Sequence, residues 1–286
     1  MKKLVLLVAV STLAACSQDN KSLEKDVQDI KKDIHEMRAM LQGGGGQRAG
    51  AAGQQRPRPP GPDGTKTYAM PVDGDPTDGP PTAKITLVKA YDYACPFCEK
   101  VRGSMDELRK KYGDDIRIVY KQFVVHPQVA YAGALAVCAA NKQGKFIEMD
   151  RLLWDKGYNA KQFDKEMPAE AGGAPQKCWE QPAGCAIVNG FASELGLNAD
   201  KFKADMKGEC FAQVQKDMKD LQQLGVGATP AFFINGRFLS GAMPTEQFVA
   251  VIDDEMKKAN EKIQAGTPAG EYYKQWVLDK GLKTVQ

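Results

Sequence analysis

The chain has 286 residues, of which 26% are charged, and its formal net charge is +3. No block of basic residues is interleaved with aromatic residues, so nucleic acid is not expected as a partner. Of the two histidines, His35 falls on a predicted stalk helix and His126 precedes Pro127, where a structural or capping role is expected. A Cys–His or Ser–His–Asp hydrolase is therefore poorly supported.

Residues 1–16 have the features of a bacterial lipoprotein signal. Lys2 and Lys3 give a positive start, and the apolar run Leu4–Val10 is too short to span a membrane. Leu13-Ala14-Ala15-Cys16 resembles a lipobox, whose cysteine is lipidated and becomes the mature N-terminus. The alternative is an ordinary secretory signal with cleavage elsewhere. Both kinds of signal predict that the chain is exported. We expect it in the bacterial cell envelope, anchored through a lipid on Cys16 and facing the periplasm. Disulfides form and persist in that compartment.

Residues 19–41 form a separate predicted element, a coiled-coil helix. Apolar residues recur there in alternating steps of four and three, the a/d pattern of about three heptads: Leu23, Val27, Ile30, Ile34, Met37 and Leu41. A lone helix of this length is marginal in water, so the pattern predicts a homo-oligomer, with a trimer favoured by isoleucine at both positions. The alternative is a solvated, partly helical spacer.

A linker follows at residues 42–67. It contains a run of four glycines and then Arg56-Pro57-Arg58-Pro59-Pro60-Gly61-Pro62, which predicts a flexible first half and a stiffer, extended second half. The catalytic domain is expected to occupy residues 68–286.

A CxxC motif, Cys95-Pro96-Phe97-Cys98, lies between a predicted strand, Ile85–Tyr91, and a helix-compatible stretch, Glu99–Lys111. Both sulfurs would lie at a helix N-terminus, where free N–H groups and the helix dipole stabilise a thiolate. Cys95 is expected to be the exposed thiol with the lowered pKa. The alternatives are a structural disulfide or half of a zinc site; no second CxxC follows, so no metal is expected.

The rest of the domain is predicted to contain a long helical stretch, about 128–224, between strands. The expected strands are Tyr68–Val72, Ile116–Tyr120 continuing to Phe123, Ala231–Ile234 and Arg237–Leu239. The expected helices are Val129–Asn141, Lys145–Lys156, Ala186–Leu195, Ala199–Lys207, Cys210–Leu224, Thr245–Ala259 and Glu271–Leu282. Asn198 is the expected N-cap of the helix Ala199–Lys207. Trp154, Trp179, Trp276 and the run Phe232-Phe233-Ile234 are expected in the core. Glu99 and Lys121 are near the motif, but exposed positions are favoured for both.

Thr229-Pro230 follows the glycine-rich loop Gly225-Val226-Gly227-Ala228 and opens an apolar strand. Because cis peptide bonds are almost always X–Pro bonds, we predict a cis bond here.

Cys138, Cys178, Cys185 and Cys210 remain outside the CxxC motif and the lipobox. Four cysteines allow three pairings. The seven-residue spacing favours Cys178–Cys185, which closes a short loop around Pro182 and leaves Cys138–Cys210 as a link between helices.

The CxxC motif together with the Thr-Pro loop resembles the thioredoxin superfamily. In that superfamily the cis-proline loop faces the CxxC motif and binds extended substrate backbone. The resemblance implies that Cys95 is the nucleophile, Cys98 the resolving thiol, and Thr229-Pro230 the substrate-facing loop. The helical stretch, with Lys142-Gln143-Gly144-Lys145-Phe146, resembles the DsbA-like family: an α/β thioredoxin fold with an inserted helical domain. The stalk is similar to those of suppressor-of-copper-sensitivity C (ScsC) and DsbC/DsbG-type proteins.

The function that follows is a cell-envelope thiol–disulfide oxidoreductase acting on exported proteins, with the Cys95–Cys98 pair as its redox-active disulfide and no other cofactor. The Pro96-Phe97 dipeptide, Thr229 and the predicted stalk favour an isomerase or reductase, reset by a membrane redox partner. The alternatives are a DsbA-type dithiol oxidase, or a Cu(I)-binding envelope protein that uses the two thiolates.

Overall fold

The computed structural model describes Gln28, Lys31 and residues 61–163 and 177–285. The predicted signal, lipidation site Cys16, linker up to residue 60 and stalk therefore lie outside the described residues, apart from Gln28 and Lys31, which are helical and exposed. The described residues from Gly61 onward belong to one compact unit, Arg58–Gln286. Within these ranges no helix is both long enough and apolar enough to cross a membrane.

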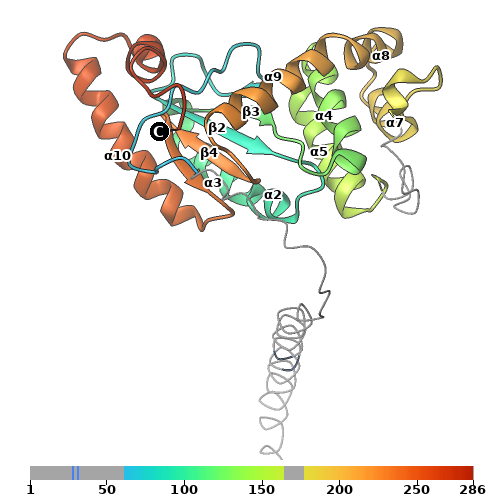
Figure 1. The fold of residues 1–286 in the computed structure, drawn as a ribbon, viewed down its shortest axis with the longest axis horizontal. Helices are drawn as coiled ribbons and strands as arrows, with labels where there is room; N and C mark the ends of the chain where they lie inside the picture. Colours follow the sequence, from blue (N-terminus) through green and yellow to red (C-terminus); the bar gives the residue numbers. More distant parts are fainter. Residues whose placement is uncertain (1–27, 29–30, 32–60, 164–176, 286) are drawn as a thin grey trace, which may run out of the picture. The chain divides into compact units, whose positions relative to one another are not determined.

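A five-stranded mixed sheet forms the centre of this unit, in the order β1-β3-β2-β4-β5 (Figure 1). β2 pairs in parallel with β3, and the other neighbours pair antiparallel. The bounds are Thr77–Asp78 (β1), Ile85–Tyr91 (β2), Ile116–Gln122 (β3), Ala231–Ile234 (β4) and Arg237–Ser240 (β5). β2 is buried along its whole length, as a central strand covered on both faces must be.

The predicted edge strand Tyr68–Val72 is wrong, because the chain here forms only isolated bridges, Thr67 with Arg237 of β5 and Tyr68 with Leu282. Tyr68 and Met70 are both buried, which gives the segment the alternation of a strand. Its backbone bonds instead join loops: Tyr68 N donates to Gly236 O, and Ala69 N donates to Leu282 O. Pro71, which lacks an N–H, ends the pattern.

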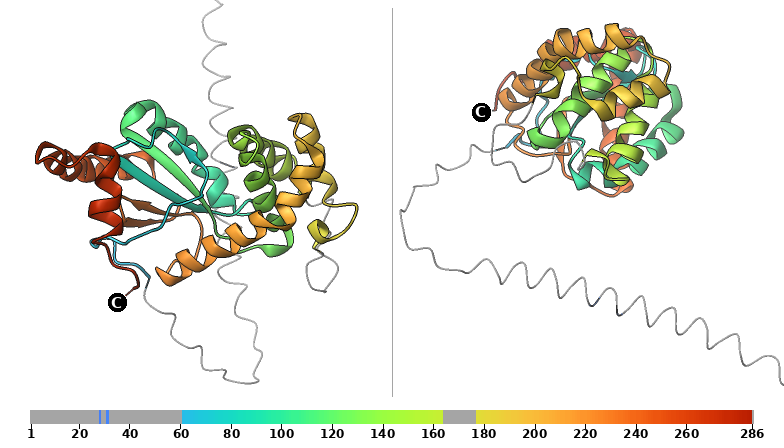
Figure 2. Two further views of the ribbon diagram at one scale, coloured as in Figure 1. Left: turned by 90° about the horizontal axis from the view of Figure 1, so that it is seen from above. Right: turned by 90° about the vertical axis from the view of Figure 1, so that its right-hand side faces the viewer.

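Two layers of helices cover the sheet. α3 (Arg102–Tyr112) and α10 (Thr245–Gln264) pack on one face; the C-terminal part of α9 (Glu209–Gln223) packs on the other, as Figures 1 and 2 show. α4 (Pro127–Asn141), α5 (Phe146–Leu152), α7 (Ala186–Glu194) and α8 (Ala199–Lys207) lie together beyond one end of the sheet. This is a thioredoxin fold with an inserted helical domain, as the sequence predicted.

The shorter helical segments complete the unit. Three of them are short helical turns, Gly113–Asp115, Cys178–Glu180 and Ala269–Glu271. The other two are wider, π-helical segments: Leu153–Asn159 replaces the end of the predicted helix Lys145–Lys156, and Tyr273–Leu278 replaces the middle of the predicted helix Glu271–Leu282. The single helix predicted over Glu99–Lys111 is two helices, α2 (Pro96–Lys100) and α3, because Val101 adopts ψ −2° between them. Asn198 caps α8 as predicted, accepting a hydrogen bond from Lys201 N.

Two disulfides hold the helical domain. Cys138 of α4 is bonded to Cys210 of α9, and Cys178 is bonded to Cys185, the pairing that the spacing favoured. The core positions predicted for Trp154, Trp179 and Phe232-Phe233-Ile234 are confirmed by their burial. Trp276 is not a core residue: it is partly buried against a smaller cluster that includes Ala259 and Tyr273.

Candidate active site

Cys95 lies where strand β2 ends and helix α2 begins, as its N-cap residue, with Pro96 in the first turn. Asp92, fully buried, fixes this turn: its carboxylate accepts hydrogen bonds from Ala94 N, Val125 N and His126 N at 2.6–2.8 Å. Asp92 thereby joins the loop before the CxxC motif to the start of α4, because its oxygens satisfy N–H groups from both.

The proline loop faces Cys95 directly. The Thr229–Pro230 peptide bond is cis, as predicted, and the Cys95 thiol donates to Thr229 O at an Sγ–O distance of 3.4 Å. While Cys95 is a thiol, the buried hydroxyl of Thr229 has no hydrogen-bond partner among the described residues; once Cys95 has lost its proton, this hydroxyl can donate to the thiolate. Two chain segments 134 residues apart are thus brought together around one sulfur.

The prediction that Cys95 is the exposed thiol is wrong: only 4% of Cys95 is exposed, because the Thr229-Pro230 loop lies against its sulfur, and Cys98 is fully buried. The two thiols differ instead in how they hold a proton. The pKa of Cys95 is lowered to about 5, chiefly by a hydrogen bond from Cys98, with further bonds from Thr229 and from backbone groups at the start of α2; burial opposes them. Burial raises the pKa of Cys98 well above its usual range. At neutral pH Cys95 is therefore the thiolate, and Cys98 is the neutral partner that donates to it.

A buried polar cluster lies on the same face of the sheet as the sulfurs. Lys89 Nζ lies 4.9 Å from the ring centroid of Tyr91, and burial lowers the pKa of this lysine, against the attraction of Asp150 and Cys98. Tyr93 donates to Asp150 Oδ1 at 2.7 Å, and burial raises the pKa of Asp150. Neither Lys89 nor Asp150 was predicted from the sequence; the available signal was a lysine inside a mainly apolar central strand.

Two exposed apolar side chains lie close to Cys95 in the chain or in the fold. Phe97 is 58% exposed and Val125 39%, and these are the large hydrophobic side chains classed as exposed in the described part of the chain. A hollow of about 460 Å³ is lined among others by Ala94, which precedes Cys95, by His126, which follows Val125, and by Phe163. Single exposed apolar residues are ordinary on protein surfaces, but two beside a reactive thiol mark a contact surface.

The structure also gives the positions of His126, Glu99 and Lys121, the three other residues considered from the sequence. His126 is the N-cap residue of α4, and its half-exposed ring lies 3.3 Å from Asp92. Glu99 accepts a hydrogen bond from Asn159. Lys121 contradicts the expected exposed position: it is fully buried, on the other face of the sheet, in an ion cluster with Asp75 and Asp217. No group of three or more potential metal ligands occurs in residues 61–163 and 177–285.

Comparison with known proteins places this arrangement in a family. A protein-family model described as "Thioredoxin" matches residues 72–254. The solved structure of Wolbachia pipientis alpha-DsbA1 is 18% identical with a TM-score of 0.52, and covers 68% of this chain and 96% of its own. The catalytic domain of Proteus mirabilis ScsC is 18% identical with a TM-score of 0.50, and covers 66% and 93%. These two likenesses concern the fold.

A different relationship is found among curated proteins. The "Na(+)/H(+) antiporter NhaA 1" of Mycobacterium sp. strain KMS is 30% identical over 203 residues, which are 68% of this chain. The chain spans 29% of the length of that antiporter.

Proposed function

This chain belongs to the thioredoxin family, and on that premise we propose that it is a disulfide oxidoreductase of the DsbA/ScsC type, which rearranges or reduces disulfides in exported proteins. The observation that carries the proposal is the position of Cys95, which caps the start of α2 and lies 3.4 Å from Thr229 O of the cis-proline loop. Hydrogen bonds there lower the pKa of Cys95 to about 5, whereas burial keeps Cys98 protonated. A thiolate, not a thiol, attacks a disulfide.

The reaction begins when the Cys95 thiolate attacks one sulfur of a substrate disulfide. A Cys95–substrate disulfide forms, and the other substrate sulfur leaves as a thiolate. In isomerase mode a second substrate thiolate attacks the mixed disulfide, which restores the Cys95 thiolate. In reductase mode Cys98 loses its proton and attacks the Cys95 sulfur, giving the Cys95–Cys98 disulfide and releasing a reduced substrate. A membrane redox partner must then return two electrons.

The site's surroundings fit a polypeptide substrate. The Thr229 carbonyl beside Cys95 Sγ offers a backbone hydrogen-bond acceptor to an extended chain, and Phe97 and Val125 offer apolar contact on either side. Two structural disulfides, Cys138–Cys210 and Cys178–Cys185, fit an oxidising compartment such as the cell envelope. Lipid anchoring at Cys16 and a trimeric stalk at residues 19–41 complete the proposal.

A dithiol oxidase is the second candidate, favoured by the same pKa of about 5. A low-pKa thiolate is a good leaving group and stabilises the reduced pair, both of which make the disulfide oxidising. Cu(I) binding, the alternative from another class, is less well supported because Cys98 holds its proton, whereas metal ligation needs two thiolates.

Trapping of mixed disulfides tests the proposal. Cys98→Ser should accumulate disulfides with exported proteins through Cys95, because the resolving step is lost, whereas Cys95→Ser should accumulate none. Equal trapping by both variants would contradict the assigned roles. Turnover of a substrate with scrambled disulfides, compared with oxidation of a reduced one, separates isomerase from oxidase. A chain lacking residues 19–41 shows whether the stalk is required.

A further inference from the structure

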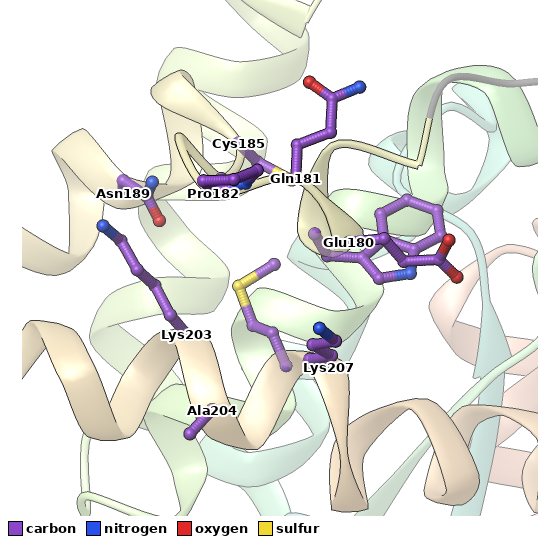
Figure 3. Close-up of a pocket in the computed structure, with 11 residues that line it drawn as sticks. Glu180, Gln181, Pro182, Cys185, Asn189, Lys203, Ala204 and Lys207 are labelled. Carbon is purple, nitrogen blue, oxygen red and sulfur yellow. The ribbon is translucent and has the colours of Figure 1, made fainter.

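A second cavity lies in the helical domain, apart from Cys95 and Cys98. It has a volume of about 270 Å³ and lies between α8, the start of α7 and the short loop closed by the Cys178–Cys185 disulfide (Figure 3). Its volume lies just below the range of about 300–1,000 Å³ that is usual for small-molecule sites, so only a small ligand fits. Nothing in the thiol–disulfide exchange uses these residues.

The lining of this cavity is mainly apolar. Trp179 and Met206 are almost fully buried, and Pro182 and Cys185 come from the disulfide loop. The indole Nε1 of Trp179 is buried and has no hydrogen-bond acceptor in the described part of the chain. A buried donor without an acceptor is costly, so an acceptor from a ligand would stabilise it.

The rim of the cavity is positively charged. Lys203 and Lys207 stand one turn apart on α8, and in Figure 3 Lys203 extends toward Asn189 on the facing helix. Neither lysine forms an ion pair with any described residue, whereas Lys201 of the same helix pairs with Asp205 at 2.7 Å. The one carboxylate of the rim, Glu180, is paired with Lys177 at 3.0 Å. Two uncompensated ammonium groups therefore stand over an apolar floor.

From these three observations we propose that the cavity binds a small amphipathic carboxylate. The apolar body of the ligand packs on Met206 and the ring of Trp179, and its carboxylate is held by Lys203 and Lys207 and supplies the acceptor that Trp179 Nε1 lacks. The site is independent of the exchange reaction at Cys95. A test of ligand binding in this cavity therefore does not depend on the proposed function.

A titration with 4-phenylbutyrate, followed in the amide and indole ¹H–¹⁵N spectrum of the full chain, tests this proposal. The protein has three tryptophans, and Trp179→Phe identifies the indole signal of Trp179. We expect a saturable shift of that signal with a Kd of about 0.1–1 mM, as for a ligand of about a dozen heavy atoms. The neutral amide of the same acid should bind at least about tenfold more weakly.

Variants make the test specific. Lys203→Gln with Lys207→Gln should weaken binding of the carboxylate by at least about tenfold, and Lys201→Gln, the matched control on α8, should leave it unchanged. Ala204→Leu, at an exposed position of the lining, should fill the cavity and abolish the shift. Equal binding of acid and amide, binding by the double variant within twofold of the original, or no saturable shift at Trp179 would overturn the proposal.

Discussion

Two lysines on neighbouring strands are both buried, but their surroundings differ. Lys121 on β3 lies in register with Ala90 of β2, one residue beyond the pair formed by Lys89 and Tyr120. Because side chains alternate along a strand, the two lysines face opposite sides of the sheet. Lys121 Nζ lies 2.7 Å from Asp75 and 2.9 Å from Asp217, whereas Lys89 lies over the rings of Tyr91 and Tyr120.

The charges follow these surroundings. Burial alone would lower the pKa of Lys121, but Asp217 and Asp75 outweigh it and raise that pKa. Burial lowers the pKa of Lys89, and the attraction of Asp150 and Cys98 only partly opposes it. The Lys121 side of the sheet is thus a neutralised structural cluster that ties the segment before β1 to α9. The Lys89 side leaves an incompletely compensated charge near the reactive sulfurs.

The largest expected difference between the two sides is in stability. Lys121→Met should lower the free energy of unfolding by about 3–5 kcal/mol, because it leaves Asp75 and Asp217 buried without a cation. Lys89→Met should change it by less than about 1 kcal/mol, because an apolar side chain there relieves the desolvation of an incompletely compensated charge. Urea unfolding of the reduced proteins measures both values. Equal losses would show that the two lysines have the same role.

The sequence predicted the sulfurs and the proline loop on the Lys89 side of the sheet, but not the burial of either lysine. The CxxC motif and Thr229-Pro230 are local patterns, and so are the strands β2 and β4, whose bounds matched the prediction. The burial of Lys121 could not be read locally. It depends on Asp75 and Asp217, which are 46 residues before it and 96 after it and meet only when the segment before β1 and α9 pack on the sheet.

The Lys121 cluster should also make stability depend on pH through Asp75. Burial, and then the charge of Asp217, raise the pKa of Asp75 to about 7. A carboxyl whose pKa is raised by folding gives its full stabilisation below its unfolded pKa of about 3.9 and loses it as the pH rises through 7. We expect the free energy of unfolding to fall by on the order of 2 kcal/mol between pH 4 and pH 7.

Asp75→Asn removes this titration and should flatten the pH profile over that range. Both proteins should carry Cys95→Ala and Cys98→Ala, because the lowered pKa of Cys95 has the opposite sign and adds stability as the pH rises from 5 to 9. An unchanged slope in the Asp75→Asn protein would refute the assignment.

On the Lys89 side, the thiol pair itself should show the next effect. The rate of Cys95 alkylation by iodoacetamide should follow its thiolate fraction, with a midpoint near pH 5, falling at lower pH. Thr229→Val should raise the midpoint by about one pH unit, because the thiolate loses a hydroxyl donor, and Thr229→Ser should restore it. If Thr229→Val has the same midpoint as the original protein, Cys98 and the backbone donors alone set the pKa of Cys95.

The smallest expected effect connects Lys89 to the reduction potential. The reduced pair carries a negative charge shared between Cys95 and Cys98, and the disulfide carries none, so a nearby cation stabilises the reduced form. Removing that cation by Lys89→Met should make the pair more reducing, by about 10–30 mV, since about 30 mV corresponds to 1.4 kcal/mol for two electrons. The shift is small because the lowered pKa of Lys89 shows that burial already opposes its charge.

Equilibration with glutathione buffers measures the potential, with Lys121→Met as the matched control from the other face. Because Lys121 is neutralised by Asp75 and Asp217, its variant should keep the original potential wherever it remains folded. A shift of equal size in both variants would assign the effect to a general loosening of the sheet and would separate Lys89 from the chemistry of the sulfurs.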